Sequence, residues 1–127
     1  MPKRQDIKSI LIIGLGRFGR HLCRKFMSLN NEVMIVDRDE AAVTALADEV
    51  TSAQIADCTD ENALRALGVK NFDLCFVCIG SDFASSLLIT SMLKDMGAAR
   101  VVAKASQDIH AKLLLRNGAD EVVYPER

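Results

Sequence analysis

Three glycines, Gly14, Gly16 and Gly19, form the pattern G-x-G-x-x-G directly after an uncharged aliphatic run at 10–13. This β-branched run is typical of a strand buried on both faces of a parallel sheet. Gly14 would permit a tight turn, Gly16 would let a pyrophosphate approach the backbone, and Gly19 would let the next helix pack closely. We therefore expect phosphates at the N-terminus of that helix, where free N–H groups and the helix dipole favour anions.

Asp37 ends the next predicted strand, at the distance at which a ribose-binding acid follows this glycine pattern. Its carboxylate can accept hydrogen bonds from both ribose hydroxyls and would repel a 2′-phosphate, so NAD, ATP or ADP fit better than NADP. Arg38 could signal NADP, but beside Asp37 we expect it to cover the adenine or to be solvated. Arg17, next to Phe18 in the glycine loop, could pair with a terminal phosphate, which favours ADP or ATP.

The ends of two later predicted strands supply further candidates. Asp57 and Cys58 end the third strand, where an adenine edge would lie, with an ordinary turn or capping residue as the alternative for Asp57. Ile79 and Gly80 end the fourth strand, and Gly80 has no side chain to keep a ligand away from the backbone. A ligand of an open α/β sheet lies across these carboxyl ends, at the point where the strand order reverses.

Two basic residues follow the fifth predicted strand. Lys104 could reach a ribose or a phosphate, with an exposed lysine as the alternative. His110 lies in the first turn of the next helix, on the ligand side, so we include it among the nucleotide-binding candidates. Residues 1–127 show no Ser/His/Asp set, paired carboxylates or tyrosine–lysine pair, and no catalytic residue is predicted.

Strands and helices alternate along the whole chain with short connections, which is typical of a parallel sheet built from βαβ units. The predicted strands are 10–13, 32–36, 52–55, 73–79, 100–103 and 121–124, and the helices are 17–29, one through 43–47, one ending at 67, 83–96 and 107–117. The prediction is a Rossmann-like, doubly wound, six-stranded parallel sheet with helices on both faces. It uses all 127 residues as one nucleotide-binding domain.

The composition narrows the class of protein. Half of the residues are apolar, 26% are charged and the formal net charge is −1, so no basic surface predicts a nucleic-acid partner. No apolar run approaches the ~20 residues that cross a bilayer, and residues 1–6 leave no room for a signal peptide. We therefore expect a cytoplasmic protein without direct membrane insertion. Cys75 and Cys78 would point to opposite faces of a strand, so we expect buried thiols rather than a metal site.

The predicted helix 83–96 carries no charge from Phe83 to Leu93, and its apolar residues cover most of its circumference. A helix on a sheet needs only one apolar stripe, about 100° wide. The helix 107–117 repeats the excess at 113–115. We expect self-association, as a homodimer or a larger ring, through these two helices.

Several stretches together resemble one family, the RCK N-terminal (KTN or TrkA-N) regulatory domain of potassium transporters, and above all its Ktr-type cytoplasmic subunits. The matching stretches are IGLGRFG at 13–19, VD at 36–37, ADCTD at 56–60, VCIG at 77–80, AKA at 103–105 and GADEVVYPE at 118–126. The resemblance implies a domain that binds ATP and ADP, or NAD(H), and that gates an integral-membrane potassium channel subunit from the cytoplasmic side. Family members usually continue into a second lobe, so we expect this chain to be the N-terminal domain with the C-terminal lobe absent.

The resemblance also assigns roles to single residues. Arg17 would meet phosphate, Asp37 the ribose, and Asp57 with Cys58 the base. Glu126 matches an acid that in some relatives helps to hold a divalent cation near the phosphates.

The leading hypothesis is a non-enzymatic regulatory module that senses adenine nucleotides through rearrangement of an oligomer. One alternative is an NAD-dependent oxidoreductase, or a fragment of one. Another is a redox sensor that uses Cys58 beside the nucleotide.

Overall fold

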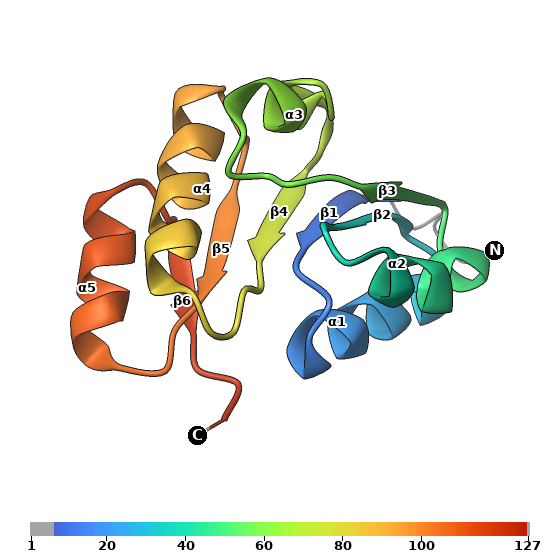
Figure 1. Ribbon diagram of the computed structural model, residues 1–127, viewed down its shortest axis with the longest axis horizontal. Coiled ribbons are helices and arrows are strands. Elements are labelled where there is room, and N and C mark those ends of the chain that lie inside the picture. Colours follow the sequence, from blue (N-terminus) through green and yellow to red (C-terminus); the bar gives the residue numbers. More distant parts are fainter. Residues whose placement is uncertain (1–6, 127) are drawn as a thin grey trace, which may run out of the picture.

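Six parallel strands form one sheet, as predicted, and their order is β3-β2-β1-β4-β5-β6. The computed structural model describes residues 7–126 (Figure 1). Residues 1–6, on which the signal-peptide prediction rests, and residue 127 lie outside the described part. The strands are β1 (Ser9–Ile13), β2 (Glu32–Asp37), β3 (Ser52–Ile55), β4 (Leu74–Val77), β5 (Val101–Lys104) and β6 (Glu121–Val123). The helices are α1 (Arg17–Ser28), α2 (Glu40–Leu46), α3 (Glu61–Arg65), α4 (Phe83–Asp95) and α5 (Asp108–Arg116).

Alternate residues of the central strands face two separate hydrophobic layers. Leu11 and Ile13 of β1 pack in the layer that holds α3, α4 and α5, whereas Ile10 and Ile12 pack in the layer that holds α1 and α2. Cys75 and Cys78 likewise fall into different layers and are buried, which confirms the prediction from their spacing. A strand buried on both faces needs apolar residues at every position, and this explains the uninterrupted aliphatic run of β1.

Three of the predicted elements end differently for local reasons, and the other predicted boundaries lie within one residue of the structure. The fourth strand was predicted over 73–79, but β4 covers only Leu74–Val77, and residues 78–80 line the cleft beyond its end. The helix through 43–47 ends at Leu46 and continues as a 3-10 turn, Ala47–Glu49. The helix predicted to end at 67 is α3, which stops at Arg65, and a second 3-10 turn, Val69–Asn71, follows it.

Much of the apolar excess of α4 is used inside the domain. Ile89 and Leu93 are buried between α4 and the sheet, and α4 also packs against α5. Three large apolar side chains of the two helices stay in contact with solvent: Leu88 (46% exposed), Ile109 (55%) and Leu115 (50%). The surface available for association is therefore smaller than the sequence pattern indicated.

The sheet order places the site. Both β2 and β4 pair with β1, so the chain crosses from one half of the sheet to the other between β3 and β4. The loops that follow β1, β2, β3 and β4 all emerge at the same edge, on either side of this reversal. Among residues 7–126 no helix has the length and apolar character that crossing a bilayer requires.

Candidate functional site

The glycine loop joins β1 to α1 and has little room for side chains. Gly14 has φ +98°, and a Cβ there would lie 2.8 Å from the carbonyl oxygen of Cys78. A Cβ on Gly19 would overlap the carbonyl oxygen of Gly14, so α1 packs on the loop only because residue 19 is glycine. A Cβ on Gly16 would meet nothing within 4 Å. The first and third glycines are therefore required by packing, whereas the second leaves its backbone open to a ligand.

Asp37, at the end of β2, connects this loop to the start of α2. Its Oδ2 accepts a hydrogen bond from the Leu15 amide at 2.8 Å, and its Oδ1 accepts one from the Asp39 amide at 2.9 Å. Each carboxylate oxygen can accept more than one hydrogen bond, so capacity for ribose hydroxyls remains. The side chain therefore fixes the shape of the loop and presents an acceptor beside it.

Two further carboxylates face the cleft from other strand ends. Asp57 accepts hydrogen bonds from the Thr59 hydroxyl (2.6 Å) and amide (3.0 Å), and these bonds lower the pKa of Asp57. Asp82, the N-cap of α4, accepts from the hydroxyl (2.7 Å) and amide (3.1 Å) of Ser85, which lowers the pKa of Asp82 in the same way. Both groups are held in their ionised form. The turn role weighed for Asp57 is thus real, and its side chain lines the cleft as well.

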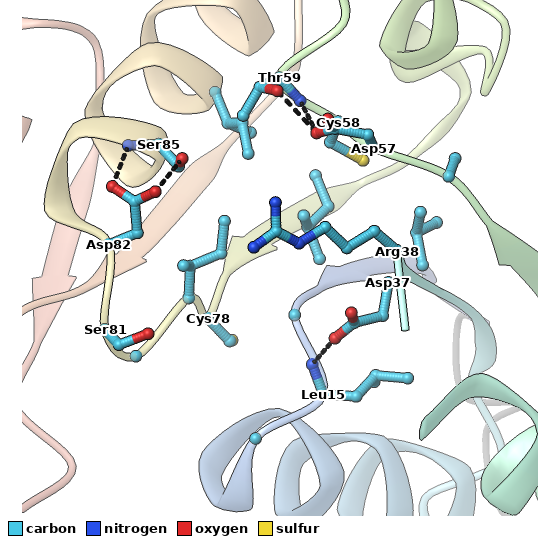
Figure 2. Close-up of a pocket in the computed structure, with 18 residues that line it drawn as sticks. Leu15, Asp37, Arg38, Asp57, Cys58, Thr59, Cys78, Ser81, Asp82 and Ser85 are labelled. Atoms are coloured by element: carbon cyan, nitrogen blue, oxygen red, sulfur yellow. Dashed lines mark hydrogen bonds between the residues drawn. The ribbon is translucent and has the colours of Figure 1, made fainter. Parts of the chain in front are cut away.

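Arg38 extends from the end of β2 across the cleft, between the Asp57 side and the Asp82 side (Figure 2). Its positive charge contributes to the lowered pKa of both Asp57 and Asp82, after the larger effect of their hydrogen bonds. Arg38 is exposed and can change position without disturbing the core. The guanidinium therefore partly balances the acidic walls of the cleft.

The floor of the cleft is apolar and encloses a cavity of about 220 Å³. Cys58 and Cys78 belong to it, and burial raises the pKa of each thiol to about 12. Thiolates are the reactive form of cysteine, so these thiols are unreactive near neutral pH. This argues against the hypothesis of a redox sensor at Cys58.

The structure brings most of the predicted residues into two adjoining cavities. The first is lined by Gly14, Gly16, Asp37, Arg38, Asp57, Cys58, Ile79 and Gly80. The second shares Ile79 and Gly80 with the first and adds Lys104 and His110.

Four predicted residues line neither cavity. Arg17 is exposed at the first position of α1, next to Gly16 at the rim of the cleft. Phe18 packs against the core beneath α1, and Gly19 serves the packing described above. Glu126 is exposed, and its Oε1 lies 3.7 Å from the Lys104 Nζ.

Glu126 was expected to help hold a divalent cation. Among residues 7–126 there is no group of three or more histidine, cysteine or acidic residues that could hold a metal ion. The described residues thus do not by themselves form such a site around Glu126, which pairs with a lysine instead.

Some lining residues were not predicted from the sequence. Ser81 and Asp82 come directly after Gly80, Ser85 lies in the first turn of α4, and Thr59 follows Cys58. The signal for Asp82 was its position between a strand-ending glycine and a helix, which is where an N-cap residue is expected. Which capping side chains also face the cleft depends on the strand order, and the sequence pattern leaves that order open.

Comparisons with known proteins agree with the fold. The TrkA-N domain model matches residues 10–125. The chain is similar to the Ktr system potassium uptake proteins C (42% identity) and A (39%) of Bacillus subtilis, each over 120 residues covering 94% of this chain but 54% of the relative. It therefore spans about half the length of these relatives.

Solved structures show the same architecture. The NAD(P)-binding domain of an exopolyphosphatase-related protein from Archaeoglobus fulgidus has a TM-score of 0.83 at 26% identity and covers 93% of this chain and 88% of its own. The TrkA-N domain of the inner membrane protein ybaL from Escherichia coli, at 19% identity, supports the fold alone with a TM-score of 0.83, covering 97% and 92%. The family model matches nearly the whole chain, and the chain belongs to the TrkA-N domain family.

Proposed function

We propose that this domain binds an adenine nucleotide in the cleft between the glycine loop and Asp37, as the non-enzymatic, regulatory part of a potassium uptake system. One observation carries the proposal: the Asp37 carboxylate is held 2.8 Å from the Leu15 amide of the loop. The Asp37 carboxylate, which can accept ribose hydroxyls, therefore lies beside the N-terminus of α1, which can accept phosphates. Both lie where the strand order reverses, which is where this type of sheet binds its ligands. The similarity to Ktr potassium uptake proteins supports the transport context.

The cleft suits the adenosine half of the ligand. Asp57 can accept a hydrogen bond from the exocyclic amine of adenine, while Ile79 and Cys58 offer apolar contact to the ring. The three acids Asp37, Asp57 and Asp82 disfavour a 2′-phosphate on the ribose, so ATP, ADP or NAD(H) fit better than NADP. Solved relatives of this fold include a GsuK channel bound to NAD and a GsuK bound to ADP, which supports the ligand class.

Arg17 is the residue proposed to sense the phosphate chain. It stands exposed at the first position of α1, where it can reach beyond the loop to a terminal phosphate. A ligand shifts a conformational equilibrium only by its difference in affinity for the two states. Contact between Arg17 and a γ-phosphate supplies such a difference between ATP and ADP.

The regulatory role requires assembly. We propose that copies associate through α4 and α5, where Leu88, Ile109 and Leu115 are exposed, and that the assembly acts on a membrane potassium channel subunit from the cytoplasm. These three side chains offer a small apolar area, whereas permanent interfaces are large. The area therefore favours an interface that can rearrange. Sedimentation velocity of Leu88→Asp and Leu115→Asp variants tests this interface. Unchanged self-association of both variants would refute it.

Calorimetry on protein stripped of nucleotide tests the binding proposal. We expect ATP and ADP to bind with distinguishable affinities and Arg17→Ala to weaken ATP more than ADP. Lys25→Ala, in the last turn of the same helix, is the matched control and should leave both affinities unchanged. Equal and weak binding of ATP, ADP, AMP and NADH would refute the sensing role. Turnover of NADH with a simple carbonyl substrate would favour the oxidoreductase alternative.

A further inference from the structure

Every exposed residue of α1 from its start to Lys25 is basic, and the residues between them pack toward the sheet. The exposed residues are Arg17, Arg20, His21, Arg24 and Lys25. Residues three and four apart lie on the same side of a helix, so these side chains form one stripe, here called the α1 basic face. The net charge of the whole chain is −1, so this concentration of positive charge is local. It lies on the side of the sheet that α1 and α2 cover (Figure 1).

Helix stability does not explain most of the α1 basic face. The helix begins with Arg17 and has no acidic residue in its first turn, where positive charge opposes the helix dipole. Arg20 and Arg24 are four residues apart, a spacing at which like charges repel. Within residues 7–126 the face has a single ion pair, between Arg24 and Glu49 at 3.1 Å, and both side chains are exposed. The unpaired charge points to an anionic partner outside the chain.

Two large apolar side chains are exposed at the C-terminal end of α1. Leu29, one turn beyond Lys25, is 57% exposed, and Ile7, just before β1, is 53% exposed. The Lys8 amide donates a hydrogen bond to the Asn31 side chain at 3.1 Å, which holds the segment of Ile7 beside the end of α1. Lys8 is itself exposed and adds another positive charge. A basic helix face bordered by exposed leucine or isoleucine is typical of proteins that lie on a membrane surface.

Charge and apolar border together select the class of partner. The cytoplasmic loops of membrane proteins carry an excess of lysine and arginine, so they are a poor source of an acidic docking segment. A nucleic acid would match the charge but would leave Leu29 and Ile7 without an apolar contact. The cytoplasmic leaflet of a membrane attracts clustered lysine and arginine through its anionic lipids, and its interface also accommodates apolar side chains.

We propose that the α1 basic face docks this domain on anionic phospholipid headgroups through Arg20, Arg24 and Lys25, with Leu29 at the interface. Arg17 is not required, because the proposed function gives it to the nucleotide phosphates. The inference goes beyond nucleotide binding and does not depend on it. The contact is peripheral and reversible, and it is sensitive to salt because the Debye length falls from about 10 Å at 0.1 M to about 3 Å at 1 M.

Co-sedimentation with vesicles tests the docking surface. We expect binding to vesicles of phosphatidylglycerol mixed with phosphatidylcholine, no binding to phosphatidylcholine alone, and a large loss of binding in about 1 M salt. Arg20→Gln/Lys25→Gln should weaken binding by about 25-fold, which is about fivefold, or about 1 kcal/mol, for each charge. Lys70→Gln/Lys112→Gln is the matched control, because both lysines are exposed and neither has an ion pair in the described part of the chain. The control should bind vesicles as the wild-type protein does.

A second double variant guards against a local structural effect. Arg20 donates a long hydrogen bond to the Gly16 carbonyl (3.4 Å), and Arg24→Gln/Lys25→Gln leaves this contact intact. It should also lose vesicle binding while its affinity for ADP stays at the wild-type value, so docking and nucleotide binding fail or succeed separately. Wild-type vesicle binding by both double variants overturns the proposal, and so does an equal loss in the Lys70→Gln/Lys112→Gln control.

Leu29→Ser distinguishes a membrane from other polyanions. It should weaken vesicle binding by about fivefold, because part of the leucine side chain leaves water when the face docks. Binding of a DNA duplex, measured in parallel, should be weaker than vesicle binding. Tighter binding of the duplex, unaffected by Leu29→Ser, would identify a nucleic-acid surface and overturn the membrane assignment, as would equal binding to vesicles of phosphatidylcholine alone.

Discussion

Replacement of Asp37 by alanine should cost both stability and nucleotide binding. The substitution removes the hydrogen bonds that its carboxylate accepts from Leu15 (2.8 Å, part-buried) and Asp39 (2.9 Å, exposed). A hydrogen bond to a charged group contributes about 1.5–3 kcal/mol, and the exposed bond contributes less because water replaces it. We therefore expect the free energy of unfolding to fall by about 2 kcal/mol, which lowers the melting temperature of a domain of this size by about 8 °C.

Urea denaturation measures the loss of stability, and calorimetry with ADP measures the loss of affinity. Asp37→Asn keeps one acceptor oxygen for the Leu15 amide and should lose about half as much stability. Asp39→Ala is the matched control, because it removes the α2 cap on the Ala41 amide (3.0 Å) and should cost about 1 kcal/mol without weakening ADP. Wild-type stability of Asp37→Ala would refute the structural role of the carboxylate, and wild-type affinity for ADP would refute its ligand role.

Three further predictions concern single contacts. Alanine is normally about 1 kcal/mol more favourable than glycine in a helix. Gly19→Ala should nevertheless lower the free energy of unfolding, measured by urea denaturation, by about 1–3 kcal/mol, because the new Cβ overlaps the Gly14 carbonyl. A more stable variant would contradict this. Iodoacetamide at pH 8 should leave Cys58, with a pKa of about 12, unmodified until denaturant is added, and rapid alkylation would contradict its burial. The Val101 amide donates a hydrogen bond to Asp120 (2.7 Å) and lowers the pKa of this carboxyl group. The wild-type protein should therefore be more stable than Asp120→Asn by the full amount above pH 3.8, the ordinary pKa, and by less as the pH falls below it. A stability difference that does not change with pH would refute this.

The alternation of apolar runs and amphipathic stretches was sufficient to predict the six parallel strands. A strand buried on both faces leaves a strong local signal, as β1 does in its run from Ile10 to Ile13. Glycines that punctuate a strand end are also local, so the loop at 14–19 could be placed. Short helices were harder to delimit, because α3 is only five residues long and passes into a 3-10 turn after Gly68.

Two pairs of charged residues at the site, Lys104 with Glu126 and Asp82 with Arg38, depend on contacts between distant segments. Lys104 and Glu126 meet because β5 and β6 pair in a register that aligns Lys104 with Val123, and nothing local to either residue encodes that register. Asp82 faces Arg38 only because β4 lies beside β1 rather than beside β3. Such pairs follow from topology, which sequence patterning constrains but does not determine.

The central claim is that an adenine nucleotide binds at the carboxyl edge of the sheet between the glycine loop and Asp37. Titration of ¹⁵N-labelled protein with ADP, followed by amide chemical shifts, tests it most directly. The claim predicts the largest shifts at Leu15, Gly16, Asp57 and Gly80, with none at the opposite edge, where Asn31 and Asp73 lie. Absence of shifts at saturating ADP, or shifts centred away from these loops, would contradict it.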